Sequence, residues 1–331
     1  MISERSWLFH VMCCLLLATL VVATACGGGG GDDDGGDGGG RTTAPTDNGD
    51  GDDGVDDGGT DGDPLDGLTF QINETFYHSG FEVELGEGSV ETQEEGVFSD
   101  EINYFLTIEG TFTNNGDSEF SFAPEMSIVQ GTKNYSLNFS TDAPTVGSGL
   151  TGEGELIFNI DEEFDYEQAK LVVGSGDETR AEVPFAPTAG DLIALAPQEV
   201  TLTGTASVAL IDLNFTGAEL RYDVPVQWSQ VDEGDRALTL NFDALSRKNG
   251  NWNVFPQDFA LTKPNGNAVP VDGSGLGSLP GSVDGIATED LYLRFLVDAD
   301  PAGDYSLRFK PADYWTEGGP AEVTFEFTVA E

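Results

Sequence analysis

Short runs in which apolar and polar residues alternate recur from about residue 67 to the end of the chain, separated by Gly, Asn, Asp and Pro. A period of two indicates half-buried antiparallel β-strands, and frequent turn residues between short strands are typical of a sandwich. No stretch of comparable length has helical periodicity, and one short helical turn is expected near residues 166–169. The pattern therefore predicts an all-β fold. The predicted strands cover residues 81–85, 104–112, 135–139, 156–160, 171–173, 183–185, 200–210, 220–228, 238–245, 259–262, 291–297, 305–309 and 323–329.

The two halves of this β region resemble each other. Residues 113–131 (TNNGDSEFSFAPEMSIVQG) can be laid against residues 247–266 (RKNGNWNVFPQDFALTKPNG), and LIFNI and AKLVV in the first half match LRFLV and DYSLRF in the second. A nearly constant offset across several turns and strands indicates a duplicated domain. We therefore predict two tandem sandwiches, residues 67–187 and 196–331, joined by a short apolar connector.

The aligned stretch of the first half contains an Asn-Gly pair, which is typical of a tight turn. Asn115 and Gly116 both belong to residue types that tolerate positive φ, which a tight β-hairpin turn requires. The pair therefore predicts a hairpin turn at this position.

The segment before the β region has a very different composition. Between residues 27 and 67 there is one valine, one leucine and no aromatic residue, and most positions are Gly or Asp. Such a segment buries too little apolar surface to offset the entropy of ordering the chain. Residues 26–66 are therefore predicted to be a disordered tether.

Cys26 directly follows an apolar run, residues 11–23, that is shorter than the roughly 20 residues needed to span a bilayer. The small residues Ala23 and Ala25 before this cysteine resemble the bacterial lipobox, in which the thiol receives a lipid before cleavage. We therefore predict a signal peptide over residues 1–25 and lipidation at Cys26, which would place the protein outside the cell, anchored to the bacterial membrane. The alternative is an ordinary secreted protein, cleaved after Ala25, with a free thiol.

The charge and the cysteines exclude some functions. The formal net charge is −47, and both the tether and the β region are acidic, so nucleic acid is not an expected partner. All three cysteines lie at positions 13, 14 and 26, so the β region has no internal disulfide.

Catalytic residues are not evident. His78 is the single histidine after the signal segment. Ser79 follows it in sequence, but adjacent residues on a strand point to opposite faces, so we predict that His78 is a surface or loop residue and not a catalytic base. With so many acidic residues, a suitably spaced carboxylate pair is not informative. The chain is therefore predicted not to be an enzyme.

Two features point to weak ligand sites. The loop that contains Asp50, Asp52, Asp53 and Asp56 approximates a Ca²⁺-binding loop, although Asp61 stands where a bidentate Glu is expected. Trp252 lies in a turn region, where a large aromatic side chain is a candidate for stacking on a sugar. The acidic residues at 161–167 are interpreted as a solvated loop.

The first sandwich resembles a family of immunoglobulin-like domains of bacterial lipoproteins, grouped with the mycobacterial immunoprotective extracellular antigen fold. The resemblance rests on YFLTIEGTFTNNGDSEFSF (104–122), MSIVQGTKNYSL (126–137), GEGELIFNI (152–160) and AKLVV (169–173). It implies two immunoglobulin-like antiparallel sandwiches after the tether, and it says almost nothing about activity.

Together these features predict a non-enzymatic cell-envelope lipoprotein that displays two immunoglobulin-like domains for surface binding. Its expected partners are the membrane, through lipidated Cys26, and an envelope protein or glycan. The alternatives are a Ca²⁺-dependent carbohydrate-binding module and, third, an envelope hydrolase.

Overall fold

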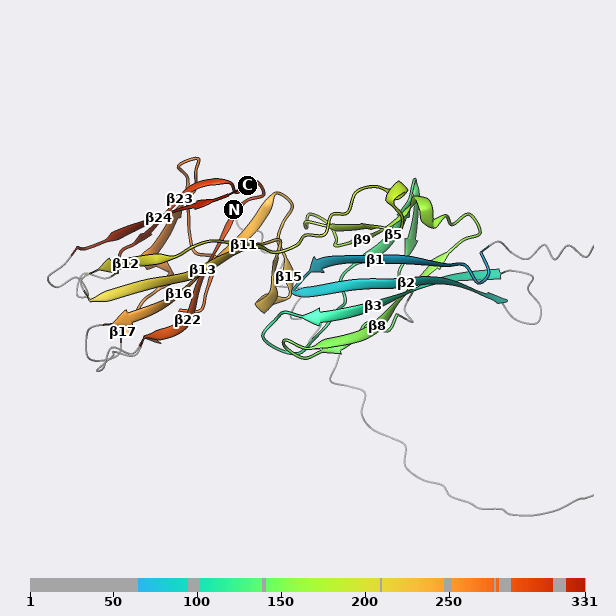
Figure 1. Ribbon diagram of the computed structural model, residues 1–331, viewed down its shortest axis with the longest axis horizontal. Coiled ribbons are helices and arrows are strands. Elements are labelled where there is room, and N and C mark those ends of the chain that lie inside the picture. Colours follow the sequence, from blue (N-terminus) through green and yellow to red (C-terminus); the bar gives the residue numbers. More distant parts are fainter. Residues whose placement is uncertain are drawn as a thin grey trace, which may run out of the picture. The chain divides into compact units, whose positions relative to one another are not determined.

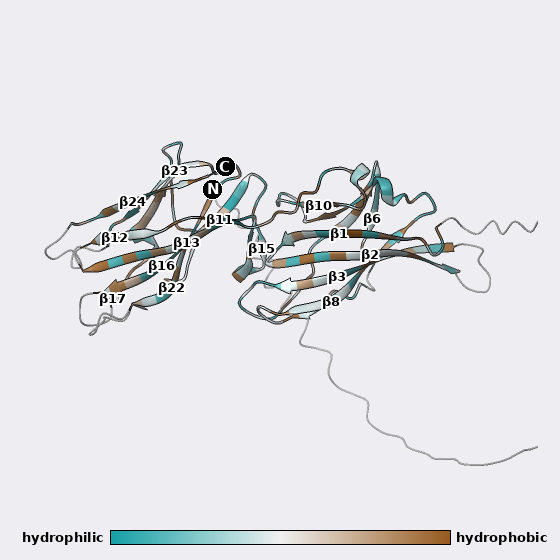
Figure 2. Ribbon diagram, in the orientation of Figure 1, coloured by the Kyte–Doolittle hydropathy of each residue, from teal (hydrophilic) through white to brown (hydrophobic). Residues whose placement is uncertain are grey.

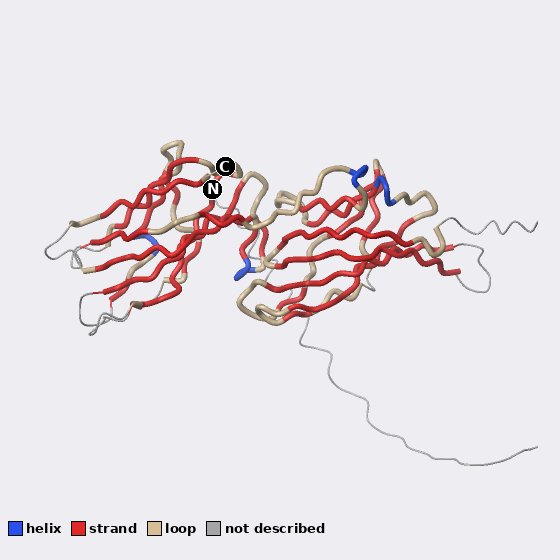
Figure 3. The backbone as a smooth tube through the Cα atoms, viewed as in Figure 1, coloured by secondary structure: helices blue, strands red, loops and turns tan. Residues whose placement is uncertain are grey.

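The computed structural model describes residues 65–94, 102–138, 141–208, 210–246, 252–276, 278–279, 287–311 and 320–330. All of them belong to the second of two compact units of the chain, Thr60–Glu331. Their regular structure is almost entirely β-strand, in antiparallel sheets (Figure 3), so the all-β prediction is confirmed. Within these ranges, no helix has the length and apolar character needed to cross a membrane.

The first half forms two sheets that pack face to face. One sheet has the strand order β1-β2-β3-β8, and the other has the order β10-β9-β5-β6 (Figure 1). A short strand pair is formed by β4 (Phe120–Ser121), which follows β3 in the chain, and β7 (Thr145–Val146), which precedes β8. The strands of the two sheets are β1 (Thr69–His78), β2 (Phe81–Glu94), β3 (Ile102–Asn114), β8 (Thr151–Ile160), β5 (Met126–Gln130), β6 (Lys133–Ser136), β9 (Ala169–Val173) and β10 (Ala181–Pro184).

The second half repeats this plan. The order β12-β13-β16-β22 corresponds to β1-β2-β3-β8, and β24-β23-β18-β19 corresponds to β10-β9-β5-β6. Two further strands, β11 (Gln198–Val200) and β20 (Gly273–Ser274), extend the first of these sheets. The corresponding strands are β12 (Gly204–Val208), β13 (Ile211–Arg221), β16 (Asp235–Ser246), β22 (Thr288–Asp298), β18 (Phe259–Thr262), β19 (Ala268–Val269), β23 (Gly303–Phe309) and β24 (Val323–Val329).

When β1 and the short strands β4 and β7 are set aside, the first, second and fifth strands (β2, β3 and β8) share one sheet and the third, sixth and seventh (β5, β9 and β10) share the other, as in an immunoglobulin-like sandwich. The motifs that align between the two halves occupy equivalent strands: LIFNI lies in β8 and LRFLV in β22, and AKLVV lies in β9 and DYSLRF in β23. Gly131 lies in the turn between β5 and β6 and Gly266 in the equivalent turn between β18 and β19, and both have positive φ (60° and 84°). The repeat seen in the sequence is therefore a repeat of strand order.

Smaller elements complete the described chain. Two further strand pairs are β14 (Asp223–Val224) with β15 (Ser229–Gln230), and β17 (Trp252–Asn253) with β21 (Ser278–Leu279). The 3₁₀ turns are η1 (Tyr166–Gln168), η2 (Pro187–Ala189), η3 (Pro225–Gln227) and η4 (Pro256–Asp258). The helical turn expected near residues 166–169 is therefore present.

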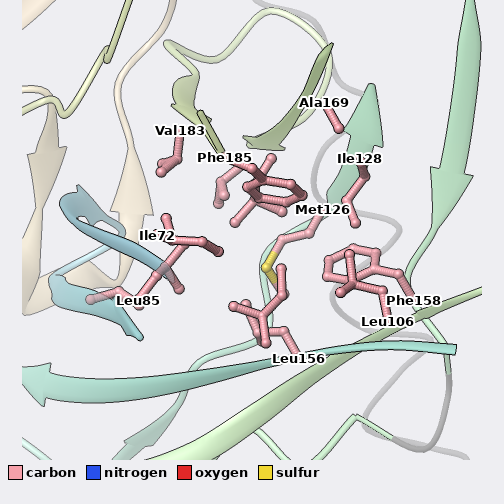
Figure 4. Close-up of a cluster of buried hydrophobic side chains, with 14 of the residues drawn as sticks. Ile72, Leu85, Leu106, Met126, Ile128, Leu156, Phe158, Ala169, Val183 and Phe185 are labelled. Atoms are coloured by element: carbon pink, nitrogen blue, oxygen red, sulfur yellow. The ribbon is translucent and has the colours of Figure 1, made fainter. Parts of the chain in front are cut away.

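Alternation along each strand produces the cores. In β3 every second residue from Tyr104 to Phe112 is buried, and hydropathy alternates along β2 in the same way (Figure 2). Inward side chains from both sheets of the first half meet in one cluster, which includes Leu106, Ile128 and Phe158 (Figure 4). A separate cluster of buried residues, from Val200 to Val329, fills the second half. Burying apolar surface between two sheets is the main stabilisation available to this chain.

The predicted domain bounds, 67–187 and 196–331, stay predictions. The first core also takes in Leu65 and Leu195, which lie just outside the first of these ranges. The connector joins the first sandwich, because Ile193 pairs with Glu182 and the Ala194 carbonyl accepts from the Tyr77 amide at 2.8 Å.

The hairpin turn predicted at Asn115-Gly116 is wrong. Neither residue has positive φ, and the segment crosses from one sheet to the other after β3. Gly116 is required here for space, because a Cβ atom would lie 2.7 Å from Trp228 Nε1. The buried Asn114 side chain accepts from the Gly116 amide at 2.8 Å and sets the bend.

Candidate functional site: an acidic groove

A groove of about 760 Å³ lies on the outer face of the sheet β1-β2-β3-β8. This volume is within the range of small-ligand pockets, about 300–1,000 Å³, although the groove is open to solvent. Six of the residues that line it carry carboxylates: Glu74, Glu84, Glu109, Asp142, Glu153 and Glu155. We call this feature the acidic groove.

Strand alternation and register bring these carboxylates together. Apolar residues of β2, β3 and β8 occupy the inward positions, so the glutamates between them face outward. Glu109 stands directly opposite Glu155, and Thr111 stands between Glu84 and Glu153 in one cross-strand row. The carboxylates therefore gather on three neighbouring strands, of which β2 and β3 are consecutive and β8 is distant in sequence.

Glycines make the sheet hollow at this point. A bulge between Leu85 and Gly88 places Gly86 beside Glu109, where no side chain fills the space. Gly110 and Gly154 also line the groove as cross-strand neighbours, but they face inward, where added Cβ atoms would lie 3.0 and 3.4 Å from the Phe112 ring.

Gly154 also lets a neighbouring segment approach. A Cβ atom there would lie 2.5 Å from the Asp142 carbonyl oxygen and 2.6 Å from Pro144 Cδ. Asp142 and Glu155 exchange two backbone hydrogen bonds, at 3.0 and 3.2 Å, which hold Asp142 at the groove edge. Glycine at position 154 therefore allows Asp142 to lie at the edge of the acidic groove.

The acidic groove has no compensating cation among the described residues. Every ion pair between described side chains lies elsewhere, and neither Lys nor Arg lines the groove. Like charges opposed across strands are unfavourable in the free protein. A cation bound in the groove would remove this repulsion, so the arrangement favours positively charged ligands.

The acidic residues near position 161 form a different environment. Lys133 Nζ and Tyr135 Oη lie 2.8 and 3.0 Å from Asp161 oxygens. Partial burial acts to raise the pKa of Asp161, but the hydrogen bonds from Lys133 and Tyr135 outweigh it and lower the pKa below its ordinary value. Burial, and then the bond to Asp161, raises the pKa of Tyr135 to about 12. Asp161 and Glu163 of this loop are therefore paired with Lys133 within the protein.

The predicted ligand residues fall mostly where the structure gives no description. Cys26 and the predicted Ca²⁺ ligands Asp50, Asp52, Asp53 and Asp56 lie outside the described residues. The backbone of Trp252 pairs with Leu279, but its side chain is also outside the described set. In the part of the chain that is described, no group of three or more His, Cys, Asp or Glu side chains is arranged to hold a metal ion.

The prediction that His78 is a surface or loop residue is wrong. It is the last residue of β1, and 2% of it is exposed. His78 has the same strand parity as the buried Phe70, Ile72 and Phe76, so the alternation rule places it inward. The spacing of Phe70, Ile72 and Phe76 in the sequence could therefore have predicted that His78 faces inward.

No protein-family model matches this chain, and no curated protein matches it. A functionally unknown protein from Listeria monocytogenes EGD-e is 15% identical, covering 37% of this chain and 89% of its own, with a TM-score of 0.28. A conserved hypothetical protein from Bacillus anthracis is 13% identical, covering 36% of this chain and 99% of its own, with a TM-score of 0.26. At such low scores neither neighbour bears on function.

Proposed function

We propose that this chain is a non-enzymatic, exported and lipid-anchored binding protein whose first sandwich binds a basic segment of an envelope protein. Export and anchoring are supported by the sequence around Cys26. Binding is supported by the acidic groove, where six carboxylates surround a hollow and none pairs with a described cation. This last observation carries the proposal.

The partner's chemistry follows from the shape and charge of the groove. The groove runs across strands and is open to solvent, so an extended cationic segment fits it better than an enclosed small molecule. Attraction between exposed charges is screened beyond about 8–10 Å at physiological salt, so binding should weaken as salt is added. An anionic glycan or lipid headgroup would be repelled by the same charges.

An oligolysine peptide provides a simple probe of this proposal. Its affinity for the full-length chain would be measured by titration calorimetry at low and high salt. A groove variant would replace four carboxylates by their amides, at Glu84, Glu109, Glu153 and Glu155. A control variant would remove four exposed charges elsewhere, at Glu199, Glu233, Glu289 and Glu322.

The two variants have the same net charge, so they separate a groove effect from a general charge effect. We expect the groove variant to lose roughly tenfold or more in affinity and the control variant to lose about threefold or less, because nearby charges are screened least. Equal losses of affinity in the two variants would show that peptide binding depends only on the net charge of the protein. Anchoring would be tested separately, by mass spectrometry of the mature amino terminus for acyl chains on Cys26.

The Ca²⁺-dependent carbohydrate-binding module and the envelope hydrolase remain alternatives from the sequence. The residues that suggested the first, the aspartates at 50–56 and Trp252, have no described side chains. No observation on the described residues favours either alternative over the acidic groove.

A further inference from the structure

His78 is buried without a hydrogen-bond partner. Neither Nδ1 nor Nε2 of its ring has a partner among the described residues, although both atoms are shielded from solvent. Buried imidazoles normally bond through at least one nitrogen, because an unpaired buried polar group is unfavourable. The ring therefore lies in a site that offers no hydrogen bond to its charged form.

This ring lies where the first sandwich contacts a hairpin of the second. The two residues after His78 bond to that hairpin, which is formed by β14 and β15. The Ser79 amide donates to Gln230 Oε1 at 3.1 Å, and the Gly80 amide donates to Asp223 Oδ2 at 2.6 Å. The hairpin is therefore bonded to the turn directly after His78, and the carboxylate of its Asp223 acts on the charge of the imidazole.

Other interactions belong to the same contact. Phe120 stacks on Trp228 with ring centroids 4.6 Å apart. The Thr179 amide donates to the Val231 carbonyl at 3.0 Å. The backbones of Glu178 and Asp232 form an isolated antiparallel β-bridge. We call this set, from the β1–β2 turn to the hairpin at 223–232, the sandwich contact.

The sandwich contact also concentrates unsatisfied polar groups. Buried side-chain nitrogens without a partner occur on four described residues, and three of them, His78, Trp228 and Gln230, belong to this contact. Each unpaired group retains a desolvation penalty that opening the contact would remove. Separating this contact should therefore cost less free energy than disrupting either apolar core.

Charged groups face His78 from each element packed against it. Desolvation lowers the pKa of the imidazole below its ordinary value of 6.5, and the carboxylates of Glu178 and Asp223 oppose this only in part. Asp223 is already engaged by Arg221, with Nε 2.6 Å from Oδ1. On the other side, Gly174 lies between His78 Nε2 and the stem of Arg180, whose guanidinium is exposed and donates to the Gly176 carbonyl.

The sign of the pH dependence follows from linkage. The pKa of His78 is lowered while the contact is closed and returns toward 6.5 when water reaches the ring. Below about 6.5 the open form therefore binds more protons than the closed form, so acid favours opening. Closure is fully favoured above that value and is progressively lost as the pH falls toward the lowered pKa.

We propose that His78 makes the sandwich contact a pH-sensitive latch, which holds the two sandwiches together at neutral pH and releases them on mild acidification. Neither core cluster contains a histidine, so mild acidification is expected to leave both sandwiches folded. On an anchored protein, release would let the first sandwich and its acidic groove reorient. This inference goes beyond the proposed function and does not depend on it.

The test measures energy transfer between dyes on the full-length chain in detergent, with the three cysteines replaced by serine. New cysteines at Glu91 in β2 and Thr324 in β24, both exposed, would carry the dyes. We expect the transfer efficiency to change between pH 7.5 and pH 5.0, with unchanged far-ultraviolet circular dichroism. The pH is not taken below 5.0, so that ordinary carboxylates remain mostly charged.

Two substitutions show whether the imidazole is responsible. His78→Leu and His78→Gln cannot be protonated, so either variant that folds should keep the pH 7.5 transfer efficiency at pH 5.0. His10→Gln, which removes the only other histidine, should leave the wild-type change intact. An unchanged wild-type signal at pH 5.0, or an equal change in the His78 variants, would overturn the latch.

Discussion

Asp223 provides the sharpest test of how the sandwich contact is held. Its side chain is 4% exposed, and it accepts from Arg221 Nε at 2.6 Å and from the Gly80 amide at 2.6 Å. Asp223→Ala would leave a buried guanidinium and a buried amide without this partner. Removing one member of a buried ion pair destabilises by about 3–5 kcal/mol.

The lower end of that range is expected here. Arg221 keeps a second carboxylate, Glu219, at 3.2 Å, but that side chain is 37% exposed and therefore partly screened by solvent. We expect Asp223→Ala to lower the free energy of unfolding by about 3 kcal/mol at pH 7.5. Guanidinium unfolding followed by circular dichroism would measure it, with each sandwich allowed its own transition.

A matched surface pair supplies the control. Asp298 pairs with Lys263 at 2.7 Å, but its side chain is 57% exposed, so Asp298→Ala should lose less than about 1 kcal/mol. Replacing both members of the buried pair by apolar residues, Arg221→Met with Asp223→Leu, should recover only part of the loss, because the Gly80 amide still lacks its acceptor. If Asp223→Ala is no more harmful than Asp298→Ala, burial does not decide the strength of this pair.

Two further substitutions test packing in the two regions described above. Phe158→Ala removes a fully buried ring from the first core and should lower the free energy of unfolding by about 3–5 kcal/mol, whereas Ile193→Ala, at a 44% exposed side chain, should change it little. Gly116→Ala would place a Cβ atom 2.7 Å from Trp228 Nε1 and should destabilise by about 1–3 kcal/mol, with a shift in tryptophan emission. Gly217→Ala, which has no atom within 4 Å, should leave that emission unchanged; a similar shift in both glycine variants would contradict the steric explanation.

Some parts of the fold were readable from the sequence because they depend on local alternation. A residue's parity on a strand decides whether it faces the core, so the strand at 104–112 was predicted from its apolar positions alone. Where a bulge shifts the parity, the pattern fails. Most of β13 was missed because a register shift between Phe215 and Gly217 moves the buried positions from one parity to the other.

The acidic groove required the tertiary structure. The sequence shows that Glu109 and Glu155 face outward from their strands, but it does not show that β3 and β8 are neighbours or that these residues are opposed. It also does not show that Gly154 admits the segment around Asp142. These facts depend on strand pairing between distant segments.

The sequence by itself determined the all-β class and the internal repeat, because both follow from periodicity along the chain. Only the tertiary structure decided the environment of His78 and the reason for Gly116. The hairpin at 223–232 lies more than 100 positions away in the chain. It bonds to Ser79, directly after His78, and it places Trp228 beside Gly116. Burial and close approach depend on which surfaces meet in three dimensions, and no local pattern in the sequence encodes that meeting.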